Sequence, residues 1–312
     1  MPHGPTKPLF TVVIPLYNKA STIRRAIDSV LAQTDPDFEL IIVDDGSTDS
    51  SVDAIQELLS ADNVTLVRTS NRGPASARNA GIEKSIGAYI SLLDADDCWD
   101  PNYLLTMRRM IANNPDGVLF TALHEVVGDD GTPVNRNSTV ALNFEAPVSD
   151  FFSLYATEPI VSSSTATIER QALQKIGSFP DGVRRGEDIY VWLRLADIGP
   201  VVLSGQKLAT IYLNAENRST AQPDFPVPYH LQQIFGAPAQ PFSQVNSRAI
   251  QSFAVRNALL QASGAVLTGH RSAARAIGEL IWPHNRVRGA AIVLLSFMPE
   301  RALRFLQRRR RS

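Results

Sequence analysis

The sequence predicts an α/β protein with a mainly parallel central sheet flanked by helices, followed by a helical C-terminal extension. Strand-like and helix-like segments alternate from Phe10 to Leu93, and the strand-like segments are apolar almost throughout. That combination is typical of parallel strands covered by helices on both faces. A chain of 312 residues, 44% of them hydrophobic, is long enough for one large domain with an appended part.

The first part of the chain alternates regularly. Strands are expected where short, β-branched apolar runs end at turn residues, over 10–14, 38–43, 64–68 and 88–93. Helices are expected where apolar residues recur at helical spacing, from Ser21 as the N-cap to Gln33 and over 51–59 and 75–86. This order predicts strand–helix–strand units, and hence a parallel sheet.

The alternation becomes irregular beyond Pro101. Helices are expected over 101–112, 171–176, 187–197, 244–267 and 272–281. Strands are expected over 117–122, 160–169, 201–203 and 209–213, and a Gly/Asp turn predicts a hairpin within 124–134. The Pro-rich stretch 223–241 is interpreted as a linker or an irregular wrap. We therefore expect a domain over residues 1–220 and a linker with a helical, basic extension over 221–312.

Charge is distributed unevenly along the chain. The formal net charge is −1, but the segment from Arg248 to the last residue has twelve arginines, no lysine and two acids, a charge of +10. The preceding 247 residues carry 18 basic and 29 acidic side chains, a charge of −11. The sequence thus predicts an acidic body with a basic tail.

Three features bear on location. Cys98 is the single cysteine, so no disulfide can form within the chain, as is usual in a reducing compartment. No N-terminal segment combines a charged start, an apolar centre and a small-residue cleavage site. The best apolar run, 290–298, is about half of the ~20 residues needed to cross a bilayer. We expect a cytoplasmic protein that does not span a membrane.

Polar residues follow three of the predicted strands at the point where each ends. The segments are Pro15-Leu-Tyr-Asn18, Asp44-Asp-Gly-Ser47 and Asp94-Ala-Asp-Asp97. Ligands of an open parallel sheet bind beyond the carboxyl ends of its strands, so these segments are expected to meet at one edge. No G-x-G-x-x-G or G-x-x-x-x-G-K-[ST] motif is present, which argues against a dinucleotide site and a P-loop.

The triplet Asp94-Ala-Asp96 has the spacing of a cation site. Residues two apart leave a strand on the same side, so both carboxylates can address one ion. Carboxylate oxygens suit Mg²⁺ or Mn²⁺, which commonly share one or two carboxylates with the phosphates of a nucleotide. The alternative for the triplet alone is a solvated acidic turn.

Five motifs taken together resemble a known family. They are Val12-Val-Ile-Pro-Leu-Tyr-Asn18, Ile41-Ile-Val-Asp-Asp-Gly-Ser-Thr-Asp49, Gly73-Pro-Ala-Ser-Ala-Arg-Asn-Ala-Gly81, Asp94-Ala-Asp-Asp97 and Gly186-Glu-Asp188. In this order and at this spacing, from about residue 9 to 215, the chain resembles the family 2 glycosyltransferases of the GT-A fold. The resemblance implies a nucleotide-binding half over about 9–100 and an acceptor half over about 101–220.

The resemblance implies roles in binding the nucleotide. Pro15 and Tyr17 would line the nucleotide pocket. Asp45, with Asp44 beside it, would bind the base, and Arg78 would approach the donor. The implied donor is a nucleotide-sugar, with a UDP-sugar the first choice.

The resemblance also implies roles at the diphosphate and the acceptor. Asp94 and Asp96 would contact the ribose and the metal-bound diphosphate, with Asp96 as the direct ligand of Mn²⁺ or Mg²⁺. Asp188 would be the general base that deprotonates the acceptor hydroxyl, with Glu187 as its rival, and transfer would invert the anomeric carbon. Trp99 is interpreted as part of the wall of the sugar pocket, with a place in the core as the alternative.

Each of these residues also has a purely structural interpretation. Asp188 could cap its helix, where an acid near the N-terminus contributes about 0.3–1 kcal/mol. Asp44 and Asp45 could form a turn before Gly46. Arg78 could be an exposed helical residue. These alternatives stay open on the sequence alone.

One feature departs from the family pattern. Many relatives have a histidine shortly after a tyrosine in the strand that follows the Glu-Asp helix, and residues 211–220 contain none. Asn214 or Arg218 could substitute, Arg218 by pairing with phosphate oxygens. Any further protein ligand of the metal is therefore left open.

The C-terminal tail joins the apolar run 290–298 to the arginine-rich segment 301–311. Such a segment can lie on an anionic membrane surface, and the alternative is a packed helix with a basic end. Aromatic residues do not interleave with the last arginines, so we expect no nucleic-acid partner. A lipid surface would bring the active site to a lipid-linked acceptor, on the inner face of the cytoplasmic membrane.

Taken together, the sequence predicts a metal-dependent, inverting glycosyltransferase that acts on a glycan or glycolipid of the bacterial cell surface. A sugar-phosphate nucleotidyltransferase would need a Gly-rich basic loop after the first strand, where residues 15–20 have Lys19 but no glycine. A non-catalytic homologue would be expected to lack acids at the metal and base positions, and both sets are present. The sequence predicts no oligomeric state.

Overall fold

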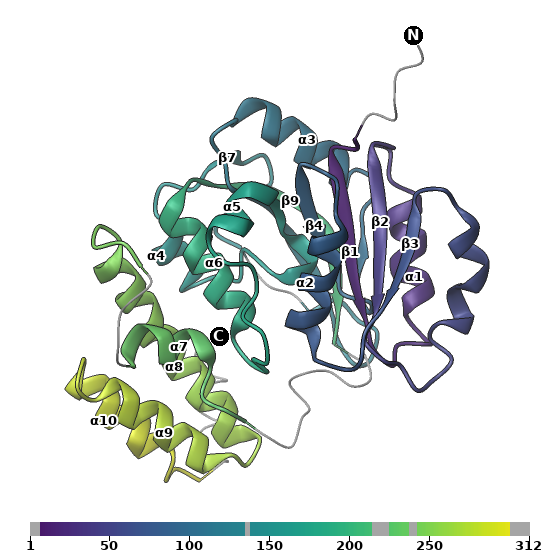
Figure 1. The fold of residues 1–312 in the computed structure, drawn as a ribbon. Coiled ribbons are helices and arrows are strands. Elements are labelled where there is room, and N and C mark those ends of the chain that lie inside the picture. Colours follow the sequence, from purple (N-terminus) through teal and green to yellow (C-terminus); the bar gives the residue numbers. More distant parts are fainter. Residues whose placement is uncertain (1–6, 135–137, 214–224, 237–241, 300–312) are drawn as a thin grey trace.

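The computed structural model describes residues 7–134, 138–213, 225–236 and 242–299 (Figure 1). Its centre is a nine-stranded sheet in the order β3-β2-β1-β4-β8-β6-β9-β5, with β7 paired to β9 outside this path. Helices cover both faces of the sheet, as the sequence predicts, and four C-terminal helices lie at one side of the molecule (Figure 1).

One half of the sheet is parallel. It contains β1 (Phe10–Leu16), β2 (Phe38–Asp44), β3 (Val64–Arg68) and β4 (Tyr89–Leu92), and each neighbouring pair is parallel. The connections contain α1 (Ile23–Leu31), η1 (Asp53–Ser60) and α2 (Pro74–Lys84). Because parallel strands share a direction, the acidic ends of β2 and β4 and the end of β1 lie at the same edge of the sheet.

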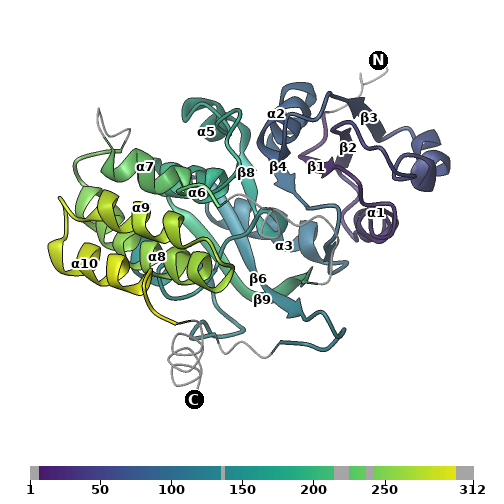
Figure 2. The same cartoon turned by 90° about the horizontal axis from the view of Figure 1, so that it is seen from below.

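The two faces of this half belong to two hydrophobic cores. Val13 of β1 packs in the core beneath α2, whereas Val12 and Ile14 pack in the core beneath α1. Successive side chains of a strand point to opposite faces, so an uninterrupted apolar strand requires cover on both. Figure 2, the view from below, shows α1 and α2 on opposite sides of β1.

The other half of the sheet is mixed. It contains β5 (Cys98–Trp99), β6 (Leu119–Val127), β7 (Glu145–Pro147), β8 (Thr167–Glu169) and β9 (Val201–Tyr212). The β6–β9 pair is parallel, and the four other pairings of these strands are antiparallel. The accompanying helices are α3 (Tyr103–Asn113), α4 (Phe151–Tyr155), η2 (Ser163–Thr165), α5 (Arg170–Lys175) and α6 (Glu187–Ile198).

Several elements differ from the sequence prediction. Helix α1 begins after Thr22 rather than Ser21, and its N-cap makes no side-chain capping bond. The predicted strands 201–203 and 209–213 form one strand, β9, which pairs with β6 across a register shift. The predicted strand 160–169 is reduced to β8, because hydroxyl groups form a capping box between Ser162 and Thr165 instead. Strand β5 was not predicted, since two residues are too short to show a period.

The C-terminal helices are α7 (Tyr229–Phe235), α8 (Ser247–Leu267), α9 (Arg271–Ile281) and α10 (Arg286–Leu295). The expectation of an irregular linker over 223–241 is wrong for 229–235, because His230, Leu231 and Ile234 are buried on a helical face. Helix α8 shares a hydrophobic core with α4 and α6, and the rings of Tyr155 and Phe253 stack with their centroids 5.2 Å apart. Within the described residues, no helix is long and apolar enough to cross a membrane.

Candidate functional site

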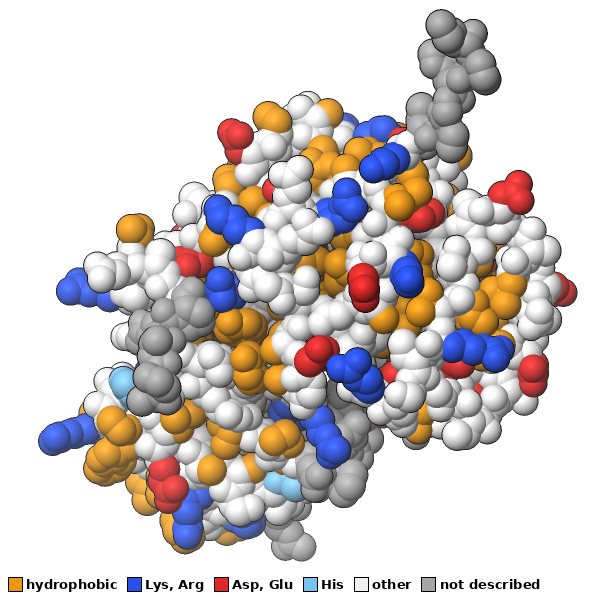
Figure 3. Space-filling model, in the orientation of Figure 1, with side chains coloured by type: hydrophobic (Ala, Val, Ile, Leu, Met, Phe, Trp, Pro, Cys, Tyr) orange, Lys and Arg blue, Asp and Glu red, His pale blue; other side chains and the backbone are white. Residues whose placement is uncertain are grey.

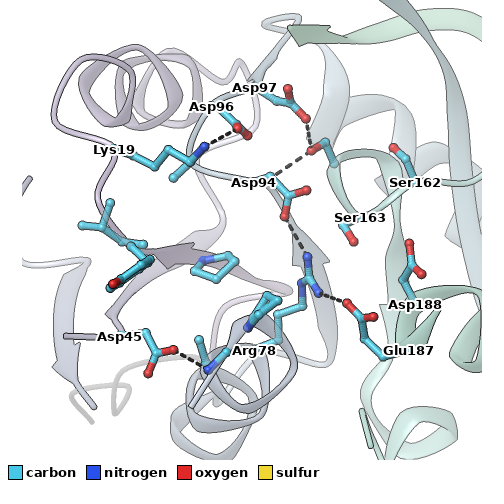
Figure 4. A pocket seen from close by; sticks show the side chains of 18 of the residues that line it. Lys19, Asp45, Arg78, Asp94, Asp96, Asp97, Ser162, Ser163, Glu187 and Asp188 are labelled. Atoms are coloured by element: carbon cyan, nitrogen blue, oxygen red, sulfur yellow. Dashed lines mark hydrogen bonds and ion pairs between the residues drawn. The ribbon is translucent and has the colours of Figure 1, made fainter. Parts of the chain in front are cut away.

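A cavity of about 410 Å³ lies at the carboxyl ends of the strands, between the parallel half of the sheet and α6 (Figure 4). Eight of the ten residues singled out from the sequence line it: Pro15, Tyr17, Asp45, Arg78, Asp94, Asp96, Glu187 and Asp188. The other two, Asp44 and Trp99, do not. The cavity therefore brings together residues more than 170 positions apart in the chain.

Asp44 and Asp45 serve different purposes at the end of β2. The Asp44 carboxylate accepts a hydrogen bond from the Ser47 amide at 3.0 Å and so closes the turn. The Asp45 carboxylate faces the cavity and accepts bonds from the Thr69 hydroxyl (2.7 Å) and from the amides of Arg72 (2.9 Å) and Gly73 (2.7 Å). Asp45 therefore fixes the loop between β3 and α2, and Asp44 is a turn residue.

Arg78 is buried at the centre of the site. Its side chain is 6% exposed; Nη2 lies 2.9 Å from Asp94 Oδ1, and Nη1 lies 3.6 Å from Glu187 Oε1. The close approach of α2 to the sheet requires Gly81, because a Cβ atom there would lie 2.5 Å from Val13 Cγ1. Arg78 is therefore not an exposed helical residue, because its side chain is buried. Its guanidinium links the end of β4 to the start of α6 (Figure 4).

Two carboxylates after β4, those of Asp94 and Asp96, each have a cationic partner. Asp94 pairs with Arg78, and Asp96 Oδ2 lies 2.8 Å from Lys19 Nζ, with both of these side chains largely buried. Arg25 also donates to the Asp96 carbonyl at 2.6 Å. These contacts argue against a solvated acidic turn and fix Asp94 and Asp96 at one wall of the cavity (Figure 4).

The carboxylates of the cavity wall can be compared with the ligands that a divalent cation requires. Among the described residues, no three or more His, Cys, Asp or Glu side chains are grouped so as to hold a metal. Two carboxylates on one wall nevertheless fit Mg²⁺ or Mn²⁺, which often take one or two protein oxygens and complete their shell with substrate phosphates and water. Asp94 and Asp96 fit a cation that binds together with a diphosphate.

A network at this wall includes Asp97 and Ser164, to which the sequence analysis gave no role. The Ser164 hydroxyl donates to Asp97 and accepts a bond from the Asp94 amide at 3.2 Å, and the Tyr212 amide donates to Asp97 at 3.1 Å. Burial is the main cause that raises the pKa of Asp97 to about 8, and the negative charges of Asp94 and Asp96 contribute to the same rise. Asp97 and Ser164 therefore position the Asp94 segment against the end of β9.

Trp99 belongs to the core rather than to the pocket wall. Its side chain is 5% exposed, its ring stacks on Tyr103 with centroids 4.1 Å apart, and its Nε1 donates to the Ser164 carbonyl at 2.7 Å. The interpretation of Trp99 as a wall of the sugar pocket is thus corrected. Its indole supports Ser164 from beneath.

The turn 185–188 places two acids in the first turn of α6. Gly186 has φ +76°, a conformation that favours glycine, and Glu187 and Asp188 both line the cavity. Burial is the main cause that raises the pKa of Glu187 to about 7, and the charge of Asp188 raises it further. The positive charge of Arg78 lowers the same pKa, but by less. Burial also raises the pKa of Asp188. The two groups titrate as a pair.

The turn 185–188 is held from the C-terminal helices. His230 of α7 is buried against Gly186, where a Cβ atom would lie 2.5 Å from its Nδ1, and His230 Nε2 lies 2.9 Å from Asn257 Oδ1 of α8. Arg185 donates to Gln261 Oε1 of α8 at 2.9 Å. The sequence analysis missed these residues, because buried polar contacts between distant segments leave no periodic signal.

Asn214 and Arg218, which were considered as substitutes for the family histidine, lie outside the described residues, as does the arginine-rich segment 301–311. The described part of β9 ends at Tyr212, whose side chain lines the cavity and whose ring lies 3.6 Å from the Arg25 guanidinium carbon. The end of β9 is therefore part of the site.

The fold is the GT-A fold of glycosyltransferases. It is similar to S. aureus TarS 1–349 in complex with UDP-GlcNAc, with a TM-score of 0.73 and 16% identity over 97% of this chain and 92% of that one. It is also similar to the mannosyltransferase PcManGT from Pyrobaculum calidifontis in complex with GDP-Man and Mn²⁺, with a TM-score of 0.58 and 18% identity over 96% and 83% of the two chains.

The chain belongs to glycosyl transferase family 2, whose model matches residues 11–177. TuaG of Bacillus subtilis (strain 168), a glycosyltransferase named for teichuronic acid biosynthesis, is 32% identical over 195 residues, which are 62% of this chain and 74% of TuaG. An uncharacterized glycosyltransferase of Rickettsia bellii (strain RML369-C) is 30% identical over 69% of this chain. The chain spans about a third of the length of the first two curated relatives that it matches.

Proposed function

We propose that the protein is an inverting glycosyltransferase that moves a sugar from a UDP-sugar to a hydroxyl group of a glycan or lipid-linked acceptor in cell-surface polysaccharide biosynthesis. The observation that carries the proposal is the position of Arg78, which joins Asp94 at the end of β4 to Glu187 at the start of α6. The carboxylates proposed to hold a metal-bound diphosphate and the acids proposed to deprotonate the acceptor hydroxyl therefore face the same cavity.

The donor would lie along the carboxyl ends of β1, β2 and β4. Tyr17 and Pro15 offer an apolar surface to the base, next to the loop that Asp45 fixes. Asp94 and Asp96 would hold a divalent cation, which supplies charge neutralisation at the departing diphosphate when it is bound. TarS, which has the same fold, was solved with UDP-GlcNAc and with UDP, and PcManGT with GDP-Man and Mn²⁺. These complexes support a nucleotide-sugar donor and a metal.

The acceptor would approach from the side of α6. The Asp188 carboxylate takes the proton of the acceptor hydroxyl, and the acceptor oxygen then attacks the anomeric carbon from the face opposite the diphosphate. The bond from that carbon to the diphosphate breaks, and a nucleoside diphosphate leaves with the electron pair. A positioned base contributes about 10²–10⁴-fold to such a reaction, and holding both substrates in one cavity contributes further.

The acceptor class is inferred from the name of a relative, and the place of action from the sequence. TuaG is named for teichuronic acid biosynthesis, which favours a cell-surface polysaccharide as the acceptor. A cytoplasmic site of action, at the inner face of the membrane, stays a prediction from the sequence.

A nucleotide-release assay tests the proposed function. A panel of UDP- and GDP-sugars is incubated with the protein and candidate acceptors, with and without Mn²⁺. We expect release of UDP from one UDP-sugar that requires both metal and acceptor, and an inverted configuration in the product. Release from no donor of the panel would contradict the proposal, and retained configuration would contradict its mechanism.

A further inference from the structure

Helix α10 is apolar on two opposite faces. Its inner face packs against α9, where a Cβ atom on Gly289 would lie 2.6 Å from Trp282 Cα, and Ile292 is fully buried. Its outer face presents Val287 (79% exposed) and Leu294 (66% exposed), and Phe297 (62% exposed) follows just beyond the helix. Val287 and Leu294 are seven positions apart and share one side of the helix. The Phe297 amide donates to the Leu294 carbonyl at 3.1 Å in the turn that follows, so we describe the three side chains as a stripe. The outer face of a surface helix is ordinarily polar.

Basic side chains border this stripe. Arg286 and Arg288 are exposed on either side of Val287. The guanidinium carbon of Arg275, on α9, lies 4.6 Å from the centroid of the Phe297 ring. Figure 3 shows hydrophobic and basic side chains, with acidic side-chain atoms among them, over the lower left of the molecule, where Figure 1 places α9 and α10. We define this surface, with the half-exposed Trp282, as the α10 face.

The charge of the segment decides between partners. The described residues 248–299 have six arginines, no lysine and one acid, a charge of +5, so two copies that met through this face would bring like charges together. A nucleic acid would pair with the arginines and leave the apolar stripe in water. A stripe of Val, Leu and Phe bordered by arginines matches an anionic lipid surface, whose phosphates meet the arginines while the apolar side chains enter the headgroup boundary.

We propose that the α10 face docks on an anionic lipid surface. Helices α9 and α10, which carry this face, pack against α8. On α8, Gln261 accepts a hydrogen bond from Arg185 of the 185–188 turn, and Asn257 contacts His230, which packs against Gly186. Figures 1 and 2 show α8–α10 together on the side of the molecule away from β3 and α1. Docking would therefore place α6 and its side of the cavity nearer to the lipid than the nucleotide-binding half. Lipid binding does not depend on glycosyl transfer, so it can be tested separately from the proposed function.

Vesicle flotation of the full chain tests this inference. The vesicles are phosphatidylcholine alone, or phosphatidylcholine with phosphatidylglycerol as the anionic lipid. We expect the wild-type protein to float with the anionic vesicles only, and less so at high salt. The variant Val287→Gln/Leu294→Gln/Phe297→Gln should lower the bound fraction by about tenfold or more. The variant Arg286→Gln/Arg288→Gln should lower it by a smaller factor.

A control variant replaces three large apolar side chains that are exposed elsewhere on the surface: Ile86→Gln/Leu105→Gln/Leu142→Gln. This variant should float as the wild type does, and calorimetry with UDP should give the same affinity for all variants, which separates lipid docking from donor binding. Equal flotation of the two triple variants would overturn the proposal, as would a wild type that binds no vesicles. A wild-type dimer in analytical ultracentrifugation that is lost in the α10-face variant would also overturn it, in favour of self-association.

Discussion

The donor side of the cavity and the 185–188 turn are held in place by different parts of the chain. The donor side, meaning Asp45, Asp94 and Asp96, is fixed largely by its own half of the sheet: Asp45 bonds to the loop after β3, and Asp96 pairs with Lys19 after β1. The 185–188 turn is fixed by α7 and α8, which follow it by 40 residues or more. A nucleotide site can thus be built locally, whereas the acids of α6 depend on the C-terminal helices.

This difference has a functional consequence. Substitutions in the nucleotide-binding half should weaken donor binding, and substitutions around the 185–188 turn should slow transfer while donor binding is kept. Arg78 is the exception, because it contacts both regions.

The largest effect is expected at Asp188. Asp188→Asn should lower kcat by about 10²–10⁴-fold, because the amide cannot accept the acceptor proton. The affinity for UDP should stay unchanged in calorimetry, since Asp188 lies on the acceptor side. If Asp188→Asn keeps its rate and Glu187→Gln loses it, the base is Glu187.

Arg78→Met should affect both regions at once. Removing the guanidinium leaves Asp94 and Glu187 without their buried counter-charge, which typically costs about 3–5 kcal/mol. Urea unfolding measures this loss, and UDP affinity should fall with it. Arg68→Met, at an exposed arginine of β3, is the control and should change neither. Equal stability of the two variants would show that Arg78 does not join the regions.

Gly186→Ala, compared with Gly177→Ala, should show whether the position of the 185–188 turn affects kcat beyond the loss of stability that alanine causes at a positive φ. The new methyl group would meet the His230 ring and a backbone at φ +76°, so the turn must shift, and kcat should fall by about tenfold. Gly177→Ala is the matched control, because Gly177 has φ +89° with nothing within 4 Å of the added atom. Gly177→Ala should lose about 1–2 kcal/mol of stability from backbone strain, and Gly186→Ala at least as much, because its methyl group also meets His230. A normal kcat in Gly186→Ala would mean that α7 does not position the acids.

The smallest effects are those of pH on the acid pair. The pKa of Glu187 is raised to about 7, so kcat should rise as pH increases through about 7 and the pair loses its shared proton. Stability should change in the opposite sense. The folded protein holds the proton more tightly than the unfolded chain, so the free energy of unfolding should fall as pH rises from about 4.5 to about 7.

The variant Glu187→Gln tests this assignment. It should flatten the pH dependence of unfolding in this range and move the rise of kcat to lower pH. An unchanged pH profile of kcat in Glu187→Gln would show that Glu187 does not titrate with the base.

The sequence predicted the donor side better than the acceptor side. Strands β1, β2 and β4 could be predicted from their apolar runs, because both faces of a parallel strand are buried. The acids that follow β2 and β4 were then placed by where these strands end. The helix α7 was missed because its seven residues give only about two turns of helical pattern within a Pro-rich surrounding sequence. Trp99 was misassigned because sequence position does not show which way a side chain points: its indole turns into the core and donates to Ser164.

A calorimetric titration of UDP tests the central claim, which is that acids after β4 hold a cation together with a nucleotide diphosphate. It compares the wild type with Asp96→Ala, with and without Mn²⁺, and uses Asp100→Asn, an exposed acid outside the cavity, as the control. We expect Mn²⁺ to strengthen UDP binding by the wild type and by Asp100→Asn, and to have no effect on Asp96→Ala. The same strengthening by Mn²⁺ in Asp96→Ala would contradict the account.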